Sequence, residues 1–288
     1  MTTLAFLDID NTLVFSRRAL AAAGWSADDP RLVAVERVRG MPVGFMTARA
    51  REQLWRLARL GLRLVPITTR TMPQYLRLDL FADVAEFAIV ANGARLLVAG
   101  TDETGWPLRC NRDVERASAP LADVQQQVRA GLTSEERERF TSRDDEFLRV
   151  IVSDLERASS LADAFEEDLG AVGWTAKADA TRLYLLPSWL NKRAAAQMLA
   201  ARLGKAEYLA AGDSPLDLGL LSSATAAITP RGGAIAASLR AGDARSSDGL
   251  ASGAPSVTLN DGPLAAEEIL EWVCMSDSQL SSTVEAER

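Results

Sequence analysis

The chain has 288 residues, 48% of them hydrophobic and 25% charged, a composition that predicts a folded protein with a sizeable core. Asp and Glu outnumber Lys and Arg by 39 to 32, and the net charge of -7 disfavours binding to nucleic acid or to an anionic membrane. The chain has no histidine, which excludes Ser-His-Asp and Cys-His catalysis and any metal site built on imidazole.

The cysteine content and the N-terminal sequence bear on the cellular compartment. Two cysteines, Cys110 and Cys274, are too few for a disulfide framework and suit a reducing compartment. The sequence has no apolar run near the roughly 18 residues that a membrane helix requires. Met1-Thr2-Thr3 leads into an apolar segment without the basic region and cleavage site of a signal peptide. We therefore expect a cytoplasmic protein.

The first third of the chain alternates between apolar runs and amphipathic segments, which predicts strands and helices in turn. The apolar run at 4–7 predicts a buried parallel strand, and residues 17–45 predict a hairpin or flap. A helix is expected from Thr47, its N-cap, to Leu60, because Gly61 follows as a stop signal. The next elements are a strand at 62–67, a helix at 72–80 and a strand at 87–91 that ends in the turn pair Asn92-Gly93.

The middle of the chain has a different pattern, with short strands at hairpin-like spacing. Strands are expected at 95–99, 147–153, 172–177 and 181–186, and helices near 119–130 and 155–169. After Pro187 the regular alternation returns. Helices are then expected at 190–203, 215–222, 233–240 and 263–273, and strands at 206–211, 225–228 and 256–259.

This change of pattern predicts an α/β fold with a doubly wound, Rossmann-like parallel sheet and an inserted α+β cap domain. The core would comprise residues 1–96 and 187–273, and the cap residues 97–186. The segment 242–254 is rich in Gly, Ser and Asp and is expected to be a surface loop. Residues 274–288 are polar and lack periodicity, so we expect a disordered tail.

Two carboxylates, Asp8 and Asp10, directly follow the first predicted strand, at the edge where open α/β sheets bind ligands. Residues two apart can both face that edge, and carboxylates this close repel unless they share a cation or a proton. A hard cation with oxygen ligands would satisfy them, and Mg²⁺ fits best. Taken alone, the pattern fits an acidic turn equally well.

A second acidic pair, Asp213 and Asp217, follows the strand at 206–211. Pro215 predicts the start of a helix, so Asp213 would lie in the loop and Asp217 one turn into the helix. The two carboxylates would then converge on one point. In isolation, such a pattern is more often an ordinary N-cap with an aspartate in the first turn.

Two further polar residues occupy comparable places in the expected topology. Thr68 ends the strand at 62–67, where its hydroxyl and the nearby amides could hold a phosphate oxygen. Lys192 begins the helix that re-enters the core, where its ammonium could neutralise a phosphate or a nucleophilic carboxylate. Each residue alone is more often a simple strand-end threonine or a solvated lysine.

The order of these features is more specific than any one of them. The segment Asp8-Ile9-Asp10-Asn11-Thr12, then Thr68, Lys192 and Asp213-Ser214 with Asp217 resemble, in this order, the four motifs of phosphatases of the haloacid dehalogenase (HAD) superfamily. The resemblance covers about residues 4–273. An insert between the second and third motifs is similar to the subfamily with a large α/β cap, which includes Cof-type and sucrose-phosphate phosphatases. Asn92-Gly93-Ala94 also resembles a turn of that subfamily, whereas Thr69, Arg193 and Leu216 depart from its usual residues.

The resemblance implies covalent catalysis. Asp8 would attack phosphorus, and Asp10 would protonate the leaving oxygen and then activate water. Mg²⁺ would be held by Asp8, the main-chain carbonyl of Asp10, and Asp213, with Asp217 in support. Thr68 and Lys192 would stabilise the phosphoryl oxygens. The other residues that the resemblance implies near the phosphate are Asn11, Thr12, Thr69, Arg70 and Asn92.

The implied function is Mg²⁺-dependent hydrolysis of a small phosphorylated metabolite such as a sugar phosphate. Two alternatives stay open at this point: a phosphomutase with the same aspartyl-phosphate, and a sugar-phosphate-binding regulatory protein without turnover. The oligomeric state also stays open. The candidates for substrate contact in the cap are Arg149, Lys177, Arg182 and Tyr184, although each also fits an ordinary surface or strand residue.

Overall fold

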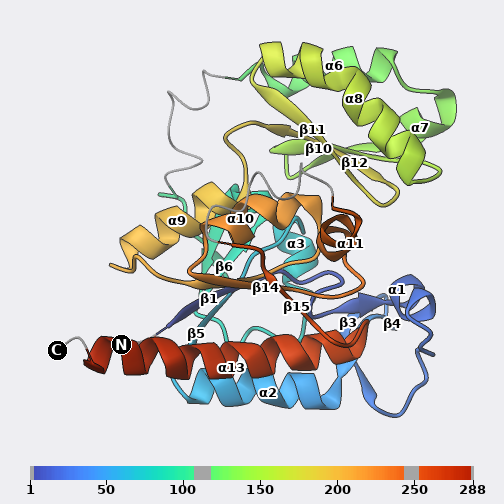
Figure 1. Cartoon of the computed structure of the whole chain (residues 1–288). Helices are drawn as coiled ribbons and strands as arrows, with labels where there is room; N and C mark the ends of the chain where they lie inside the picture. Colours follow the sequence, from blue (N-terminus) through green and yellow to red (C-terminus); the bar gives the residue numbers. More distant parts are fainter. Residues whose placement is uncertain (1–2, 107–117, 243–252, 287–288) are drawn as a thin grey trace.

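A parallel sheet lies at the centre of the larger part of the molecule (Figure 1). The computed structural model describes residues 3–106, 118–242 and 253–286 of the chain. The five strands, in spatial order, are β15 (Ser256–Val257), β14 (Ala226–Thr229), β13 (Leu209–Ala211), β1 (Leu4–Leu7) and β5 (Arg63–Pro66). All neighbouring pairs are parallel, so the carboxyl ends of the strands meet at one edge.

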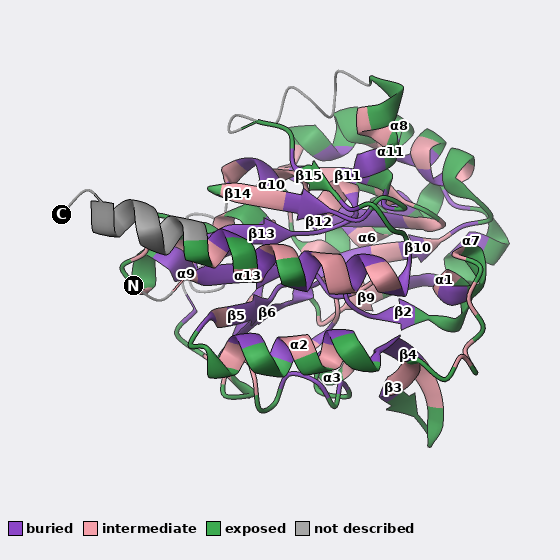
Figure 2. Ribbon diagram, turned by 60° about the horizontal axis from the view of Figure 1, so that its bottom comes forward, coloured by how far each residue is buried: buried purple, intermediate pink, exposed green. Residues whose placement is uncertain are grey.

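Helices cover both faces of this sheet, which explains why its strands are apolar throughout. Alternate β1 residues point to opposite faces. Ala5 and Leu7 pack in the cluster formed with α2 (Ala48–Arg59) and α13 (Pro263–Ala286). Leu4 and Phe6 pack instead with α9 (Lys192–Arg202) and α10 (Leu218–Ser223). Figure 2 shows α2 and α13 with mixed buried and exposed residues along one side of the sheet. The expected doubly wound core is thereby confirmed.

An antiparallel meander extends the core beyond β5. It consists of β6 (Phe87–Val90), β7 (Arg95–Val98) and β8 (Thr101–Asp102), and Ile89 of β6 bridges to Ile67 in the parallel sense. The predicted core boundary at residue 96 falls within β7, which pairs with β6, and β8 in turn pairs with β7.

A β-hairpin follows the first strand, as the sequence predicted for residues 17–45. Its arms are β3 (Leu32–Val38) and β4 (Met41–Thr47), and β2 (Phe15–Ser16) pairs with β4. The helix α1 (Arg17–Ala22) was not predicted. The helix expected at 72–80 is only α3 (Met72–Tyr75), because the chain then leaves the helix to pair with β3. There the Asp79 amide donates to the Val35 carbonyl at 2.9 Å.

The cap is a four-stranded antiparallel sheet backed by helices. Its strands, in spatial order, are β11 (Trp174–Asp179), β12 (Arg182–Pro187), β10 (Phe147–Ile151) and β9 (Phe140–Arg143). Its helices are α6 (Leu121–Ala130), α7 (Ser134–Glu138) and α8 (Leu155–Ala171). One face of the sheet, with Leu148, Val150 and Leu183, packs in one hydrophobic cluster with residues of α6 and α8. The other face turns toward the core (Figure 1). The expected α+β cap is confirmed, and α7 and β9 are additions to it.

The cap contacts the core directly. Phe147 and Tyr184 of the cap pack in one buried cluster with Ala91 and Ala94, which flank the Asn92-Gly93 turn of the core. At the other end of the same junction, the Asp144 carboxylate accepts from the Met72 amide at 3.0 Å. The two parts therefore enclose the space between them on two sides.

The C-terminal region differs from its prediction. The sequence placed the end of the last helix at 273 and a disordered tail at 274–288, whereas α13 runs through Ala286. The prediction was wrong for this segment because Val273 and Ser276 are buried at the start of its polar part. The buried face of α13 therefore continues past residue 273 to Ser276. The loop expected at 242–254 lies mostly outside the described residues. Within the described ranges, no helix is both long and apolar enough to cross a membrane.

Candidate active site

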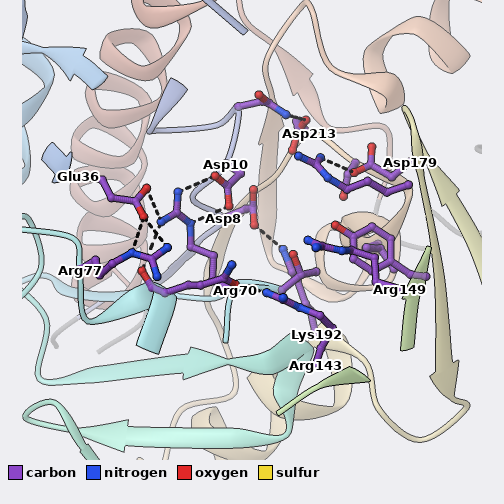
Figure 3. Close-up of a pocket in the computed structure, with 17 residues that line it drawn as sticks. Asp8, Asp10, Glu36, Arg70, Arg77, Arg143, Arg149, Asp179, Lys192 and Asp213 are labelled. Carbon is purple, nitrogen blue, oxygen red and sulfur yellow. Dashed lines mark hydrogen bonds and ion pairs between the residues drawn. The ribbon is translucent and has the colours of Figure 1, made fainter. Parts of the chain in front are cut away.

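The carboxyl edge of the parallel sheet brings together residues that are far apart in sequence (Figure 3). Asp8 follows β1, and its amide donates to the carbonyl of Ala211, the last residue of β13, at 2.9 Å. Asp213 follows β13 two residues later, so it meets Asp8 at the same edge. Lys192 is the first residue of α9, whose N-cap Asn191 accepts from the Ala194 amide. The topology thus joins the predicted first, third and fourth motifs in one place.

Lys192 is a buried cation between two carboxylates. Its Nζ donates to Asp8 Oδ1 at 2.5 Å and to Asp217 Oδ1 at 2.6 Å, and its side chain is 1% exposed. Burial by itself would lower the pKa of Lys192, but the charges of Asp217 and Asp8 outweigh it and raise the pKa. The ammonium therefore stays charged at neutral pH.

The neighbouring carboxylates are short of positive charge. Burial raises the pKa of Asp8 to about 7, against the opposing charge of Lys192. Burial and the negative charges of Asp8 and Asp217 also raise the pKa of Asp213 well above its ordinary range. One lysine is not enough to hold this group fully ionised, and a further cation would stabilise the ionised carboxylates.

The cluster has the ligands that a hard divalent cation prefers. One carboxylate oxygen each of Asp8, Asp213 and Asp217 lies within 4.8 Å of the others, and all three residues are buried. Asp217 is already bound on both oxygens, because its Oδ2 accepts from the Ser214 amide at 3.1 Å and hydroxyl at 2.8 Å. The other oxygens of the cluster are held at longer distances: Asp8 Oδ2 accepts from Thr12 at 3.2 Å, and Asp213 accepts from Thr12 and Asn11 at 3.5 Å. Asp8 and Asp213 are therefore the better candidates for metal ligands, and Asp217 holds Lys192 in place.

A glycine keeps Asp217 close to the end of β13. A Cβ atom on Gly212 would lie 2.4 Å from Asp217 Cγ, a distance that no side chain tolerates. The glycine at this position thus has a packing reason. It lets the short helix Pro215–Asp217, which carries Asp217, approach the end of β13, which Asp213 follows.

Asp10, whose main-chain carbonyl was the predicted metal ligand, has a side chain in a different environment from those of the three clustered aspartates. Its carboxylate forms two 2.8 Å bonds with Arg70, from Nε to Oδ2 and from Nη2 to Oδ1, and lies outside the three-aspartate cluster. The side chain is 47% exposed. Asp10 lines the cavity described below.

Arg70 connects Asp10 to the hairpin. Its Nη1 donates to Glu36 Oε2 at 2.9 Å, and Glu36 Oε1 in turn accepts from Arg77 at 3.0 Å. Sequence reasoning missed Glu36 and Arg77. Glu36 is a buried charge directly after buried Val35 in β3, and the alternation of the strand does not mark it in the sequence.

The other residues predicted near the phosphate fall into two groups. Asn11, Thr69 and Arg70 line the cavity described below. Thr12, Thr68 and Asn92 are buried behind it. Thr12 Oγ1 donates to Asp8 Oδ2 at 3.2 Å, and Thr68 Oγ1 accepts from the Arg70 amide at 3.1 Å.

Asn92 lies at the turn that abuts the start of α9. Its Nδ2 donates to the Leu190 carbonyl at 3.1 Å. The next residue, Gly93, has φ of 116°, and a Cβ there would lie 3.1 Å from the Asn191 carbonyl oxygen. The Asn92-Gly93 turn therefore positions the N-terminus of α9, and with it Lys192.

A cavity of about 210 Å³ lies between core and cap. Its core side contains Asp8, Asp10, Asp213 and their partners, and its cap side contains side chains from β9, β10, β11 and β12. The lining residues are Asp8, Asp10, Asn11, Glu36, Thr69, Arg70, Gln74, Arg77, Arg143, Arg149, Asp179, Arg182, Tyr184, Lys192, Asp213, Ser214 and Leu216.

The cap candidates divide accordingly. Arg149, Arg182 and Tyr184 line the cavity, whereas Lys177 is exposed and does not. Arg143 and Asp179 line it too and were not predicted. Without the strand β9 and its register, nothing in the sequence distinguished Arg143 from the other arginines of the cap.

Comparison with solved structures gives the same fold. The sucrose-phosphatase of Synechocystis, in complex with sucrose and phosphate, aligns with a TM-score of 0.62 at 17% identity, over 96% of this chain and 99% of that chain. A haloacid dehalogenase-like hydrolase from Bacteroides thetaiotaomicron aligns with a TM-score of 0.52 at 16% identity, over 95% of this chain and 100% of that chain. A sugar phosphatase of HAD subclass IIB aligns with a TM-score of 0.53 at 13% identity, over 89% of this chain and 93% of that chain.

At these identities the likeness concerns the fold. The chain has the fold of these HAD-type phosphatases and hydrolases, and the resemblance predicted from the motifs is confirmed at the level of the fold. No family model matches the sequence. No curated protein matches it either.

The carboxylate cluster predicts an unusual pH dependence for the metal-free protein. The pKa of Asp8 is raised from 3.8 to about 7 in the folded protein. The protonated carboxyl therefore contributes stability to the folded state that is fully present below pH 3.8 and is lost as the pH rises to about 7. In EDTA, the midpoint of thermal unfolding should fall by several degrees from about pH 5 to about pH 8. Asp8→Asn protein is the control, and an equal fall in that variant would exclude Asp8 as the cause.

Proposed function

We propose that this protein is a Mg²⁺-dependent phosphomonoesterase that acts on a small phosphorylated metabolite through an aspartyl-phosphate. The single observation that carries the proposal is the contact of Asp8 with Lys192 beside Asp213, at the carboxyl edge of the parallel sheet. A carboxylate that is to attack a phosphate dianion needs positive charge on both sides of it. This site supplies an ammonium and a set of oxygens suited to a divalent cation.

Asp8 is the proposed nucleophile. Its Oδ1 accepts from Lys192 and its Oδ2 from Thr12, so the carboxylate is held in one orientation at the cavity. Attack of a carboxylate oxygen on phosphorus forms the aspartyl-phosphate and breaks the bond to the ester oxygen. Lys192 remains beside the phosphoryl group and stabilises its negative charge.

Asp10 is the proposed acid and base. It lines the cavity two residues after Asp8, and Arg70 holds both of its oxygens. In the first step it gives its proton to the leaving ester oxygen. In the second step it takes a proton from the water that attacks the aspartyl-phosphate, and inorganic phosphate leaves with Asp8 restored.

The residues present fit a magnesium ion. Asp8 and Asp213 would hold it with their carboxylates, together with the main-chain carbonyl of Asp10, and Asp217 would support the site through Lys192 and Ser214. When bound, Mg²⁺ would neutralise charge on the phosphoryl oxygens. The raised pKa values of Asp8 and Asp213 are the expected property of such a site without its cation.

The two parts of the chain are proposed to divide the work. Residues 1–96 and 187–273 would form the catalytic domain, extended to residue 102 by β7 and β8, and the rest of 97–186 would form the specificity domain. The phosphoryl-binding groups are in the core, whereas the cap covers the remainder of a cavity of about 210 Å³. A space of this size suits a small metabolite rather than a polymer.

The test is the release of inorganic phosphate from p-nitrophenyl phosphate, with Mg²⁺ and with EDTA. We expect phosphate release to require Mg²⁺ and to proceed without a bisphosphate activator. Release without the activator also separates a hydrolase from a mutase. Asp213→Asn should raise the Mg²⁺ concentration for half-maximal activity by at least about tenfold, because one anionic ligand is lost. Asp179→Asn is the matched control, since it removes a carboxylate from the same cavity but outside the cluster. An equal Mg²⁺ requirement in both variants would refute the metal assignment.

A further inference from the structure

The cap face of the cavity is unusually rich in arginine (Figure 3). Arg143 on β9 lies opposite Phe147, and Arg149, two residues further along β10, lies opposite Tyr184 on β12. Because alternate strand residues share a face, Arg143 and Arg149 are diagonal neighbours on the side of the sheet that faces the core. Arg182 contributes a third guanidinium from β12.

These arginines differ from the cations of the core in their contacts with carboxylates. Lys192, Arg70 and Arg77 each contact a carboxylate at 3.0 Å or less. Arg182 has Asp179 at 3.9 Å. Among the residues that the structure describes, Arg143 and Arg149 form no ion pair with a carboxylate. Arg143 donates to the side-chain oxygen of Gln74, and Arg149 Nε is buried without a hydrogen-bond partner.

The surroundings of these two arginines disfavour their charge. Burial lowers the pKa of Arg149, and the nearby Arg182 lowers it further. Burial likewise lowers the pKa of Arg143, followed by the charge of Arg149. A guanidinium nevertheless remains protonated at neutral pH. Two half-buried like charges without a carboxylate in contact are unfavourable for the protein alone, and an anion that enters the cavity would balance them.

The phosphoryl group of the substrate is not the natural partner of these arginines. In the proposed function that group lies against Asp8, where Lys192 and the magnesium site supply its positive charge. Arg143 and Arg149 belong to the cap sheet on the other side of the cavity. They would therefore meet the part of the substrate that is not transferred.

We propose that the substrate carries a second anionic group, a carboxylate or a second phosphate, which binds between Arg143 and Arg149. This inference rests on the proposed function and narrows its substrate class to phosphomonoesters with a further negative charge. A planar guanidinium binds either group with paired hydrogen bonds, so the two sources share one recognition chemistry. The cavity of about 210 Å³ is small enough for one small molecule to bring an anionic group to each of its two sides.

Two matched pairs of esters test the proposal. 6-Phosphogluconate and glucose 6-phosphate differ by a carboxylate, and fructose 1,6-bisphosphate and fructose 6-phosphate differ by a phosphate. With Mg²⁺, we expect kcat/KM for the doubly anionic member of at least one pair to exceed that of its partner by at least about tenfold. The pair that shows the preference identifies the group as carboxylate or phosphate.

Variants then assign the preference to the arginines. Arg149→Gln and Arg143→Gln should each reduce the ratio within the preferred pair by about tenfold or more, mainly through KM of the doubly anionic ester. Lys177→Gln is the control, because it removes one positive charge from the same sheet outside the cavity. The ratio in that variant should stay at the wild-type value. Equal kcat/KM within both pairs, or an equal change of the ratio in Lys177→Gln and Arg149→Gln, would overturn the proposal.

Equilibrium binding separates this inference from the proposed function. Calorimetric titration of the wild-type protein with the same four esters in EDTA measures affinity without turnover. Hydrolysis without preference in either assay would overturn the second-anion site alone. Preferential binding that Arg149→Gln removes, together with no hydrolysis of any ester, would overturn the phosphatase proposal and support the anion site.

Discussion

Asp8→Asn protein should release no measurable phosphate from any ester, a loss of at least about 10⁴-fold in kcat. The amide that replaces the carboxylate has no anionic oxygen to attack phosphorus, so no covalent intermediate can form. The variant should nevertheless remain folded, because the substitution removes a negative charge from a cluster in which burial raises the pKa of Asp8 to about 7. Phosphate release by malachite-green assay and the midpoint of thermal unfolding are the measurements.

Asp10→Asn is the matched control for this result. It changes the other carboxylate of the motif by the same atoms, but it leaves the nucleophile and Lys192 in place. The expected loss is about 10²–10⁴-fold, and smallest for nitrophenyl phosphate, whose leaving group departs without a proton. Near-normal turnover by Asp8→Asn protein free of wild-type enzyme would refute the covalent mechanism. Equal losses on activated and ordinary esters in Asp10→Asn would refute the acid role of Asp10.

Much of the core could be predicted from the sequence because its signals are local. The apolar run of β1 matches the predicted residues 4–7, and the helix start at Thr47 is the observed N-cap of α2, where its hydroxyl accepts from the Ala50 amide. Parallel strands meet at one edge, so residues placed at strand ends had to converge. Asp8, Lys192 and Asp213 therefore lie together although 184 residues separate Asp8 from Lys192.

The parts that could not be predicted depend on long-range pairing. Glu36 is buried because Arg70 and Arg77, from another segment, neutralise it, and no local pattern announces that contact. The helix at 72–80 stops early because Leu78 pairs with Glu36 in preference to continuing the helix. The polar segment after residue 273 is helical because Val273 and Ser276 continue a buried face that composition alone does not reveal.

The cap shows the same limit at the level of single side chains. Its strands were expected, but which face of a strand meets the core depends on the register of the sheet. Arg149 and Lys177 are both paired with Tyr184 and share its face, yet only Arg149 and Tyr184 line the cavity, so the position along the sheet also decides which side chains reach it. Arg143 could be recognised only after β9 was known to pair with β10.

Lys192→Met should be the most damaging single change to the site as a whole. The substitution removes the buried cation that bridges Asp8 and Asp217 and leaves two carboxylates without it. Breaking a buried ion pair from one side destabilises a protein by about 3–5 kcal/mol, because the remaining charge is uncompensated. We therefore expect a lower free energy of unfolding in urea and a loss of activity of at least about 10³-fold, since the phosphoryl group also loses its ammonium.

A second substitution separates the two effects. Asp217→Asn in the Lys192→Met background removes one of the uncompensated charges, so it should recover part of the lost stability. Activity should stay lost, because the recovered fold still lacks the cation beside Asp8. Lys205→Met, just beyond the C-terminal end of α9, is the control for removing a lysine near the same helix and should leave both quantities close to wild type. A double variant no more stable than Lys192→Met would mean that the carboxylates do not repel one another. The proposed metal site would then lose its basis in that repulsion, and the raised pKa of Asp213 would need another cause.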